Sequence, residues 1–188
     1  MSEESIVSVE AFLLASEEYC AFIERADQIG RPELLHGVHC RLADVYAAAL
    51  RLPEVRSGLP PRVENLSADA SSWDKSGEIA LAKQLKVLIG GVDLTKEVYG
   101  EEALPDRLSD DLASVYSELK GALDLWSVGD QNGEILWEWS FGFIHHWAQH
   151  ATSGAAAVAS YDVRISGPGV GIMSAALTRM EAEDFVAH

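Results

Sequence analysis

The chain has few cysteines, few basic side chains and no long uninterrupted apolar segment. Cys20 and Cys40 are its only cysteines, and two are too few for the disulfide framework of a small secreted domain. Fourteen lysine and arginine residues stand against thirty aspartate and glutamate residues, which gives a formal net charge of −16. Because nucleic-acid binding depends on cations that neutralise phosphates, we expect no nucleic-acid partner.

The amino terminus, MSEESIVSVE, lacks the basic segment and apolar run of a secretory signal. No apolar run approaches the about 20 residues that a membrane-spanning helix needs. We therefore expect a soluble, cytoplasmic protein without a membrane partner, and we interpret its acidity first as a means of staying soluble. Cys20 falls at the edge of the polar side of its predicted helix, so no disulfide is expected.

The composition is that of a globular protein, with 48% hydrophobic and 23% charged residues in a chain of 188. This length favours one domain. Helical periodicity predicts an all-α, single-domain bundle of about five helices within residues 1–161. Residues 162–188 read as a tail that is broken by glycine and proline and contains a short amphipathic segment from about Met173 to Phe185.

Capping residues and helix breakers set the expected helix boundaries. The first helix begins near Ser5 or Ser8 and runs to Ile29, and the second opens at Pro32 and is closed by Pro53. Residues 51–76 are predicted to be a surface connection with Trp73 docked on the core. The later helices are expected at residues 77–89, from Ser109 with Asp110 and Asp111 in the first turn, and at residues 132–161.

The stretch 132–161 holds three of the five tryptophans and three of the six histidines, and it is the expected central helix. At 100° per residue its main apolar face contains Ile135, Trp139, Phe143, His146, His150 and Ala157, joined at its edge by Leu136 and Trp147. A second apolar strip contains Trp137, Phe141, Ile144 and Ala148. A helix that is apolar nearly all round belongs inside a bundle. His146 and His150 are then inside, where their ring nitrogens need partners.

A metal site is one way to satisfy these histidines. His146 and His150 lie one helical turn apart, and His39, on the inward arc of the second helix, could supply a third ligand for zinc or nickel. Three protein ligands and an open position would activate a bound water. The spacing resembles that of DinB-type four-helix bundles, which place one histidine on the second helix and an H-x-x-x-H pair on the last. A metal-dependent hydrolase or transferase is therefore the alternative function.

Two other interpretations remain open. The histidines can be core residues that are hydrogen-bonded to tyrosine or carboxylate partners, which would help to fix a unique packing. They can also belong to a small-molecule pocket, and its expected lining residues are Trp139, Phe143, Trp147, Tyr46 and Tyr116. No nucleophile motif such as G-x-S-x-G is present. We therefore assign no catalytic residue and expect no cofactor under the leading interpretation.

Two segments resemble a bacterial family that is catalogued as domain of unknown function 5063. DDLASVYSELKGAL, residues 110–123, is similar to its D-D-L-A-D-I-Y-x-D-L-K-x-G-L helix, and WEWSFGFIHHWAQH, residues 137–150, is similar to its W-E-W-x-F-x-F-x-x-H-W-x-x-H helix. EEYCAFIE, residues 17–24, looks like its amino-terminal helix. The resemblance covers most of residues 7–159 and implies a compact all-α domain without an established activity.

The chain departs from the family pattern at two places. Residues 92–106 replace an aromatic W-x-V-F-D-P string, and ATSGAAAVASY follows His150 where the family continues with an Ala-Leu-Arg-Ala-Leu-His run. With no catalytic motif, the leading hypothesis is a protein-binding or accessory module without catalytic activity. The sequence does not indicate its oligomeric state.

Overall fold

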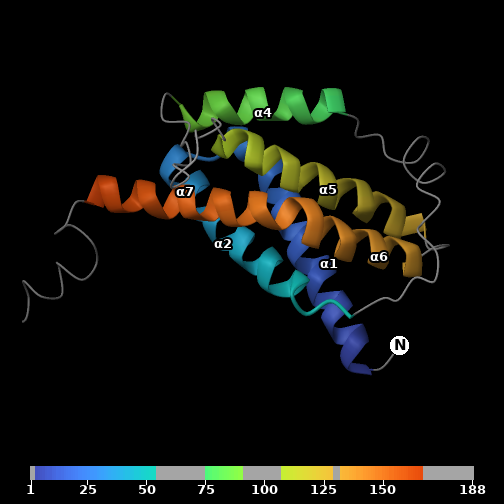
Figure 1. Ribbon diagram of the computed structural model, residues 1–188. Coiled ribbons are helices and arrows are strands. Elements are labelled where there is room, and N and C mark those ends of the chain that lie inside the picture. Colours follow the sequence, from blue (N-terminus) through green and yellow to red (C-terminus); the bar gives the residue numbers. More distant parts are fainter. Residues whose placement is uncertain (1–2, 54–74, 91–106, 129–131, 167–188) are drawn as a thin grey trace, which may run out of the picture.

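A computed structural model describes residues 3–53, 75–90, 107–128 and 132–166 (Figure 1). Every regular element in these ranges is helical, which confirms the predicted all-α fold. The elements are α1 (Glu3–Glu24), η1 (Ala26–Gln28), α2 (Arg31–Ala49), α4 (Lys75–Ile89), α5 (Leu108–Val128), α6 (Asn132–Gly142), η2 (Phe143–Trp147) and α7 (Ala148–Ser166).

Four helices enclose the core. α1 packs against α2 and α5, and α7 packs against the same two helices, so that the four form a closed bundle. α4 lies on the outer side of α5 and runs antiparallel to it (Figure 1). α6 and η2 extend α7 along α5, which makes 132–166 the long element that crosses the bundle. The central position predicted for this stretch is thus confirmed.

α1 shows how the apolar pattern positions a helix. Phe12, Ser16, Tyr19 and Ile23 recur at intervals of four, three and four residues, and all four are buried, as expected for one face of a helix with a period of 3.6. α1 ends at Glu24, and the single turn η1 replaces the continuation to residue 29 that the sequence predicts. Cys20, expected at the margin, is 3% exposed and belongs to the core.

α5 begins earlier than predicted, because Leu108, which precedes the expected capping residue Ser109, is already helical. The Arg107 carbonyl accepts hydrogen bonds from the backbone N–H groups of Asp110 and Asp111, both at 3.0 Å, so the helix opens before Ser109. Ser109 is 1% exposed and lies inside the first turn instead of capping it. Asp110 and Asp111 lie in this turn as predicted, where their charge favours the positive end of the helix dipole.

A close contact joins α1 and α2 at Gly37. A Cβ at this position would overlap the ring of Phe22, and the Arg41 guanidinium lies 4.1 Å from the centroid of the same ring. Gly37 therefore marks a close helix contact. The cost of a glycine inside a helix, about 1 kcal/mol against alanine, is accepted here because no larger residue fits.

The long element contains a π-helical turn, which changes the side chains that face the core. η2 spans Phe143–Trp147, and a π turn closes its hydrogen bonds over one more residue than an α turn. The inward position therefore moves from His146 to Trp147. Trp147 is 0% exposed, whereas the side chain of His146 is 49% exposed. The prediction that His146 lies inside the bundle is wrong for this reason.

Some predictions fall outside the described residues. The docking of Trp73 and the amphipathic segment 173–185 are among them. α7 continues to Ser166, five residues past the predicted end at Tyr161. Within the described ranges, no helix has the length and apolar character needed to cross a membrane.

Candidate functional site

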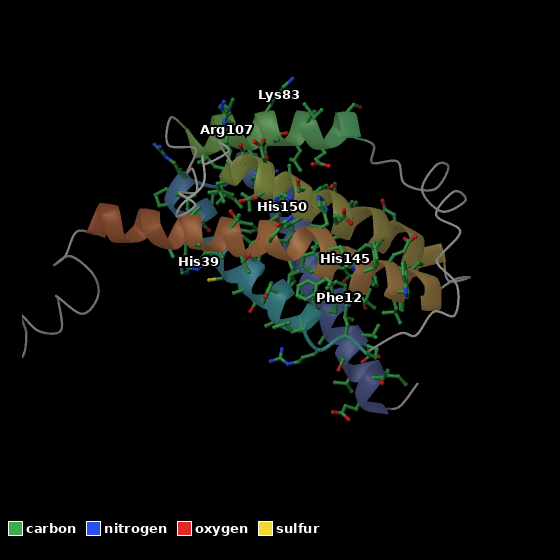
Figure 2. The ribbon with its side chains drawn as sticks, viewed as in Figure 1. Phe12, His39, Lys83, Arg107, His145 and His150 are labelled. Carbon is green, nitrogen blue, oxygen red and sulfur yellow. The ribbon has the colours of Figure 1, made fainter. Side chains whose placement is uncertain are left out.

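A polar seam runs between α5 and the long element. His150, on the side of α7 that faces α5 (Figure 2), has Nδ1 2.7 Å from Oδ1 of Asp111. The side chain of His150 is 20% exposed and that of Asp111 is 3% exposed. A carboxylate this deeply buried needs hydrogen-bond partners, because leaving it unpaired would be costly. The imidazole of His150 supplies one of them.

A second pair lies one turn away at the rim of the seam. His146 Nδ1 lies 2.8 Å from Oε1 of Glu118, with side-chain exposures of 49% and 38%. Gly142 makes room for this carboxylate, since a Cβ there would lie 3.3 Å from Glu118 Oε2. The four residues Asp111, Glu118, His146 and His150 form what we call the histidine–carboxylate ladder.

The residues of the ladder are spaced differently along the two elements that carry them. Its carboxylates are seven residues apart on α5 and its histidines four apart on the long element, separations of about 10 Å and 6 Å along α-helical axes. The longer side chain of Glu118 bridges much of the difference. The two imidazole rings meet edge to face, with centroids 5.0 Å apart. The seam thus fixes the register of antiparallel α5 and α7.

Chemically, a carboxylate on Nδ1 fixes the orientation and tautomer of a histidine. The same arrangement supports histidines that bind metals or act as general bases. Among the described side chains, however, no group of three or more histidine, cysteine, aspartate and glutamate residues is placed to hold a metal ion. His39, predicted as the third ligand, is partly buried on α2 and appears at the opposite edge of α7 from His150 in Figure 2. The three predicted ligands are thus not brought together.

The aromatic residues predicted to line a pocket pack against one another instead. Trp139 and Trp147 are 2% and 0% exposed, and the ring of Phe12 lies between them, with centroids 5.1 Å and 6.2 Å away. Phe143 contacts Trp147 at 4.8 Å and Tyr46 at 5.2 Å. These rings fill the core.

Tyr116, the remaining predicted lining residue, belongs to a separate polar cluster between α1 and α5. Its hydroxyl donates to Glu24 Oε1 at 2.9 Å, and Lys120 Nζ lies 3.2 Å from the same oxygen. Burial, followed by the hydrogen bond to Glu24, raises the pKa of Tyr116 well above its ordinary value. Desolvation lowers the pKa of Lys120, but the hydrogen bond to Glu24 and the nearby carboxylates outweigh it and raise this pKa overall.

Two members of the second apolar strip, Phe141 and Ile144, are exposed although the sequence placed the strip inside, whereas Ala148 packs against the core. Trp137 and Phe141 stack with ring centroids 4.9 Å apart and planes 13° from parallel. Phe141 contacts the His145 ring at 4.3 Å. Phe141 is 49% exposed and Ile144 is 72% exposed. We call Trp137, Phe141, Ile144 and His145 the aromatic face. The periodicity shows two apolar strips, but it does not show that the bundle leaves part of the second uncovered.

Comparison with known proteins places the chain in a family. A family model with the description "Domain of unknown function (DUF5063)" matches residues 6–163. The chain belongs to this family. The two segments that suggested the DUF5063 family, residues 110–123 and 137–150, supply all four residues of the histidine–carboxylate ladder.

A solved structure shares the fold. Protein BF1032 from Bacteroides fragilis superposes with a TM-score of 0.71 at 21% sequence identity, over 85% of this chain and 94% of that chain. No curated protein matches the chain. At this identity the likeness shows that the two proteins share a helical architecture.

Proposed function

We propose that this DUF5063 domain acts by binding another protein through its aromatic face, without catalysing a reaction itself. The observation that supports this is the exposure of Phe141 and Ile144 on the central element of the bundle, with the Phe141 ring in contact with the rings of Trp137 and His145. Exposed apolar patches on soluble domains frequently mark interaction sites. Aromatic side chains are also enriched among the residues that dominate binding energy.

The aromatic face is preorganised. Trp139 and Trp147, on the opposite side of the same element, are anchored in the core, so the backbone that carries Trp137 and Phe141 is held in place. The Trp137–Phe141 stack also restricts both rings before a partner arrives. Less conformational entropy is then lost on binding, which favours affinity.

The charge of the chain defines the partner further. A protein with a net charge of −16 attracts basic surfaces and repels acidic ones. We therefore expect a partner segment that places apolar side chains on Phe141 and Ile144 and surrounds them with lysine or arginine. Complementary charge of this kind raises the association rate and is weakened by salt.

A capture experiment tests this function. The immobilised wild-type domain and a Phe141→Ser/Ile144→Ser variant are incubated with lysate at low salt. Val87→Ser is the matched control, because Val87 is 79% exposed on α4, away from the aromatic face. We expect a partner that the wild type and Val87→Ser retain, that the double variant loses, and that elutes as salt is raised. The same captured proteins with all three baits would contradict the proposal.

The alternative is a metal-dependent hydrolase or transferase that uses His39, His146 and His150 with zinc or nickel, and it requires His39 to move toward the other two, because the described side chains do not bring the three together. The observation in its favour is that Nδ1 of both His146 and His150 lies against a carboxylate, the arrangement that orients metal-binding histidines. Elemental analysis of protein purified without a metal-affinity tag tests it. Stoichiometric metal that is lost in His146→Ala would support it, and sub-stoichiometric metal unchanged by that substitution would end it.

A further inference from the structure

A groove opens on the far side of α5 from the aromatic face, between α4 and the first turn of α5. Its volume is about 370 Å³, which falls in the range of small-molecule sites. Three cationic side chains, Lys83, Lys86 and Arg107, line it. Figure 2 shows Lys83 and Arg107 at this edge of the bundle.

These three cations differ from the other described basic side chains. Lys120 pairs with Glu24 and Asp124. The other arginines each donate to a backbone carbonyl: Arg25, Arg31, Arg41 and Arg51. Within the described part of the chain, no such ion pair or side-chain hydrogen bond engages Lys83, Lys86 or Arg107. In a protein of net charge −16, the basic side chains that lack such a partner among those described thus share one groove.

The carboxylates at the groove do not neutralise these cations fully. Both oxygens of Glu78 accept hydrogen bonds from α5, from Ser114 at 2.9 Å and from Ser117 at 3.1 Å. Asp110 lies in the first turn of α5, where the helix dipole already favours negative charge. Three cations therefore line a groove with two carboxylates, and both oxygens of one of these, Glu78, accept hydrogen bonds from serines of α5.

The rest of the groove is apolar. Ile79, which is 48% exposed, and Ala82 lie beside the cations. Ile79, Ala82, Lys83 and Lys86 occupy positions i, i+3, i+4 and i+7 of α4, which form one helix face about 10 Å long. A ligand that lies along this face contacts the apolar side chains Ile79 and Ala82 with one end and the cationic side chains with the other.

We propose that this groove binds a small molecule that joins a phosphate group to a short apolar chain or ring. The phosphate pairs with Lys83, Lys86 and Arg107, because a dianion is best matched by several cations, including the planar guanidinium of arginine. The apolar part covers Ile79 and Ala82. This site is independent of the aromatic face and of the proposed function.

Calorimetric titration of the full chain at low ionic strength tests the proposal. Hexyl phosphate carries both chemical features, inorganic phosphate carries the anion alone, and 1-hexanol carries the apolar chain alone. We expect hexyl phosphate to bind at least about tenfold more tightly than either of the others, because both ends of the groove contribute. Equal binding of hexyl phosphate and inorganic phosphate would overturn the amphipathic assignment.

Substitutions locate the binding. Lys83→Glu and Arg107→Glu are expected to weaken hexyl phosphate binding about tenfold or more. Arg51→Glu makes the same charge change on an exposed residue that follows the end of α2, and it serves as the matched control. Ile79→Ser should weaken hexyl phosphate and leave inorganic phosphate unchanged. Absence of saturable binding, or an equal loss in Arg51→Glu, would overturn the proposal.

A vesicle experiment distinguishes a soluble ligand from a lipid headgroup of the same chemistry. The protein is sedimented with phosphatidylcholine vesicles that contain or lack phosphatidic acid. We expect no co-sedimentation in either case, since an anionic membrane repels this acidic protein. Sedimentation with phosphatidic acid that is lost in Lys83→Glu, without binding of hexyl phosphate, would replace the soluble ligand with a membrane.

Discussion

His150 Nδ1 lies 2.7 Å from Oδ1 of Asp111, a carboxylate 39 residues earlier in the chain and 2% exposed. This contact ties the first turn of α5 to the start of α7. The neighbouring pair of His146 and Glu118 has similar geometry but lies in contact with solvent. The two pairs form a matched comparison, in which burial is the main difference.

Replacing each histidine with alanine should lower the free energy of unfolding by different amounts for the two pairs. His150→Ala removes one partner from a buried carboxylate and is expected to lower the free energy of unfolding by about 2 kcal/mol. His146→Ala breaks an exposed pair and should cost less than about 1 kcal/mol. Urea denaturation followed by tryptophan fluorescence measures both values. Equal losses would show that burial of Asp111 does not control the energy of the ladder.

Gly37→Ala should destabilise the protein although alanine is the better helix former. The new Cβ would overlap the Phe22 ring, and forcing the helices apart costs about 1 to 3 kcal/mol. Gly133→Ala is the control, since nothing lies within 4 Å of a Cβ there. This control should leave the thermal midpoint unchanged or raise it slightly. A higher midpoint for Gly37→Ala would contradict the close contact.

The two cysteines should react at very different rates. Burial raises the pKa of Cys20 to about 12, so almost none of it is thiolate near pH 8, and the thiolate is the reactive form. Cys40 is exposed on α2. We expect a thiol reagent to label one cysteine in the folded protein and two in denaturant, as mass spectrometry can show. If the folded Cys40→Ser variant were labelled as fast as the folded wild type, this assignment would be refuted.

Stability should fall at alkaline pH. Burial raises the pKa of Tyr19 and of Tyr116 above the ordinary value of 10.0, and the Tyr19 hydroxyl donates to the Leu112 carbonyl at 2.9 Å. Above about pH 10 the unfolded chain releases these protons while the folded chain keeps them. The stabilisation is therefore fully present below that pH and is lost as the pH rises.

Tyr116→Phe tests this pH dependence. The variant loses the hydrogen bond to Glu24, and it also loses one of the groups whose proton release favours unfolding at alkaline pH. Its free energy of unfolding should start lower near neutral pH and fall less steeply than that of the wild type between about pH 9 and pH 11. Circular dichroism of urea unfolding at each pH gives the slopes. Parallel slopes would exclude Tyr116 as a contributor.

Much of the helical framework could be predicted from the sequence. Phe12, Tyr19 and Ile23 follow the helical period, and they are buried as that period requires. Asp110 and Asp111 lie in the first turn of α5, as predicted. Residues 110–123 and 137–150 also suggested the family that the family model shows. These features depend on periodicity, capping and local sequence, which act within a single segment.

The candidate sites depended on contacts between segments. The π turn moved Trp147 into the core and His146 out of it, and no helical projection with a constant period contains that shift. The partners Asp111 and Glu118 come from α5, and the cationic groove exists only because α4 lies against the start of that helix. The sequence by itself thus determined the helices and their two-sided apolar character. Only the tertiary structure decided which parts of the strips are covered, because burial depends on where neighbouring helices pack.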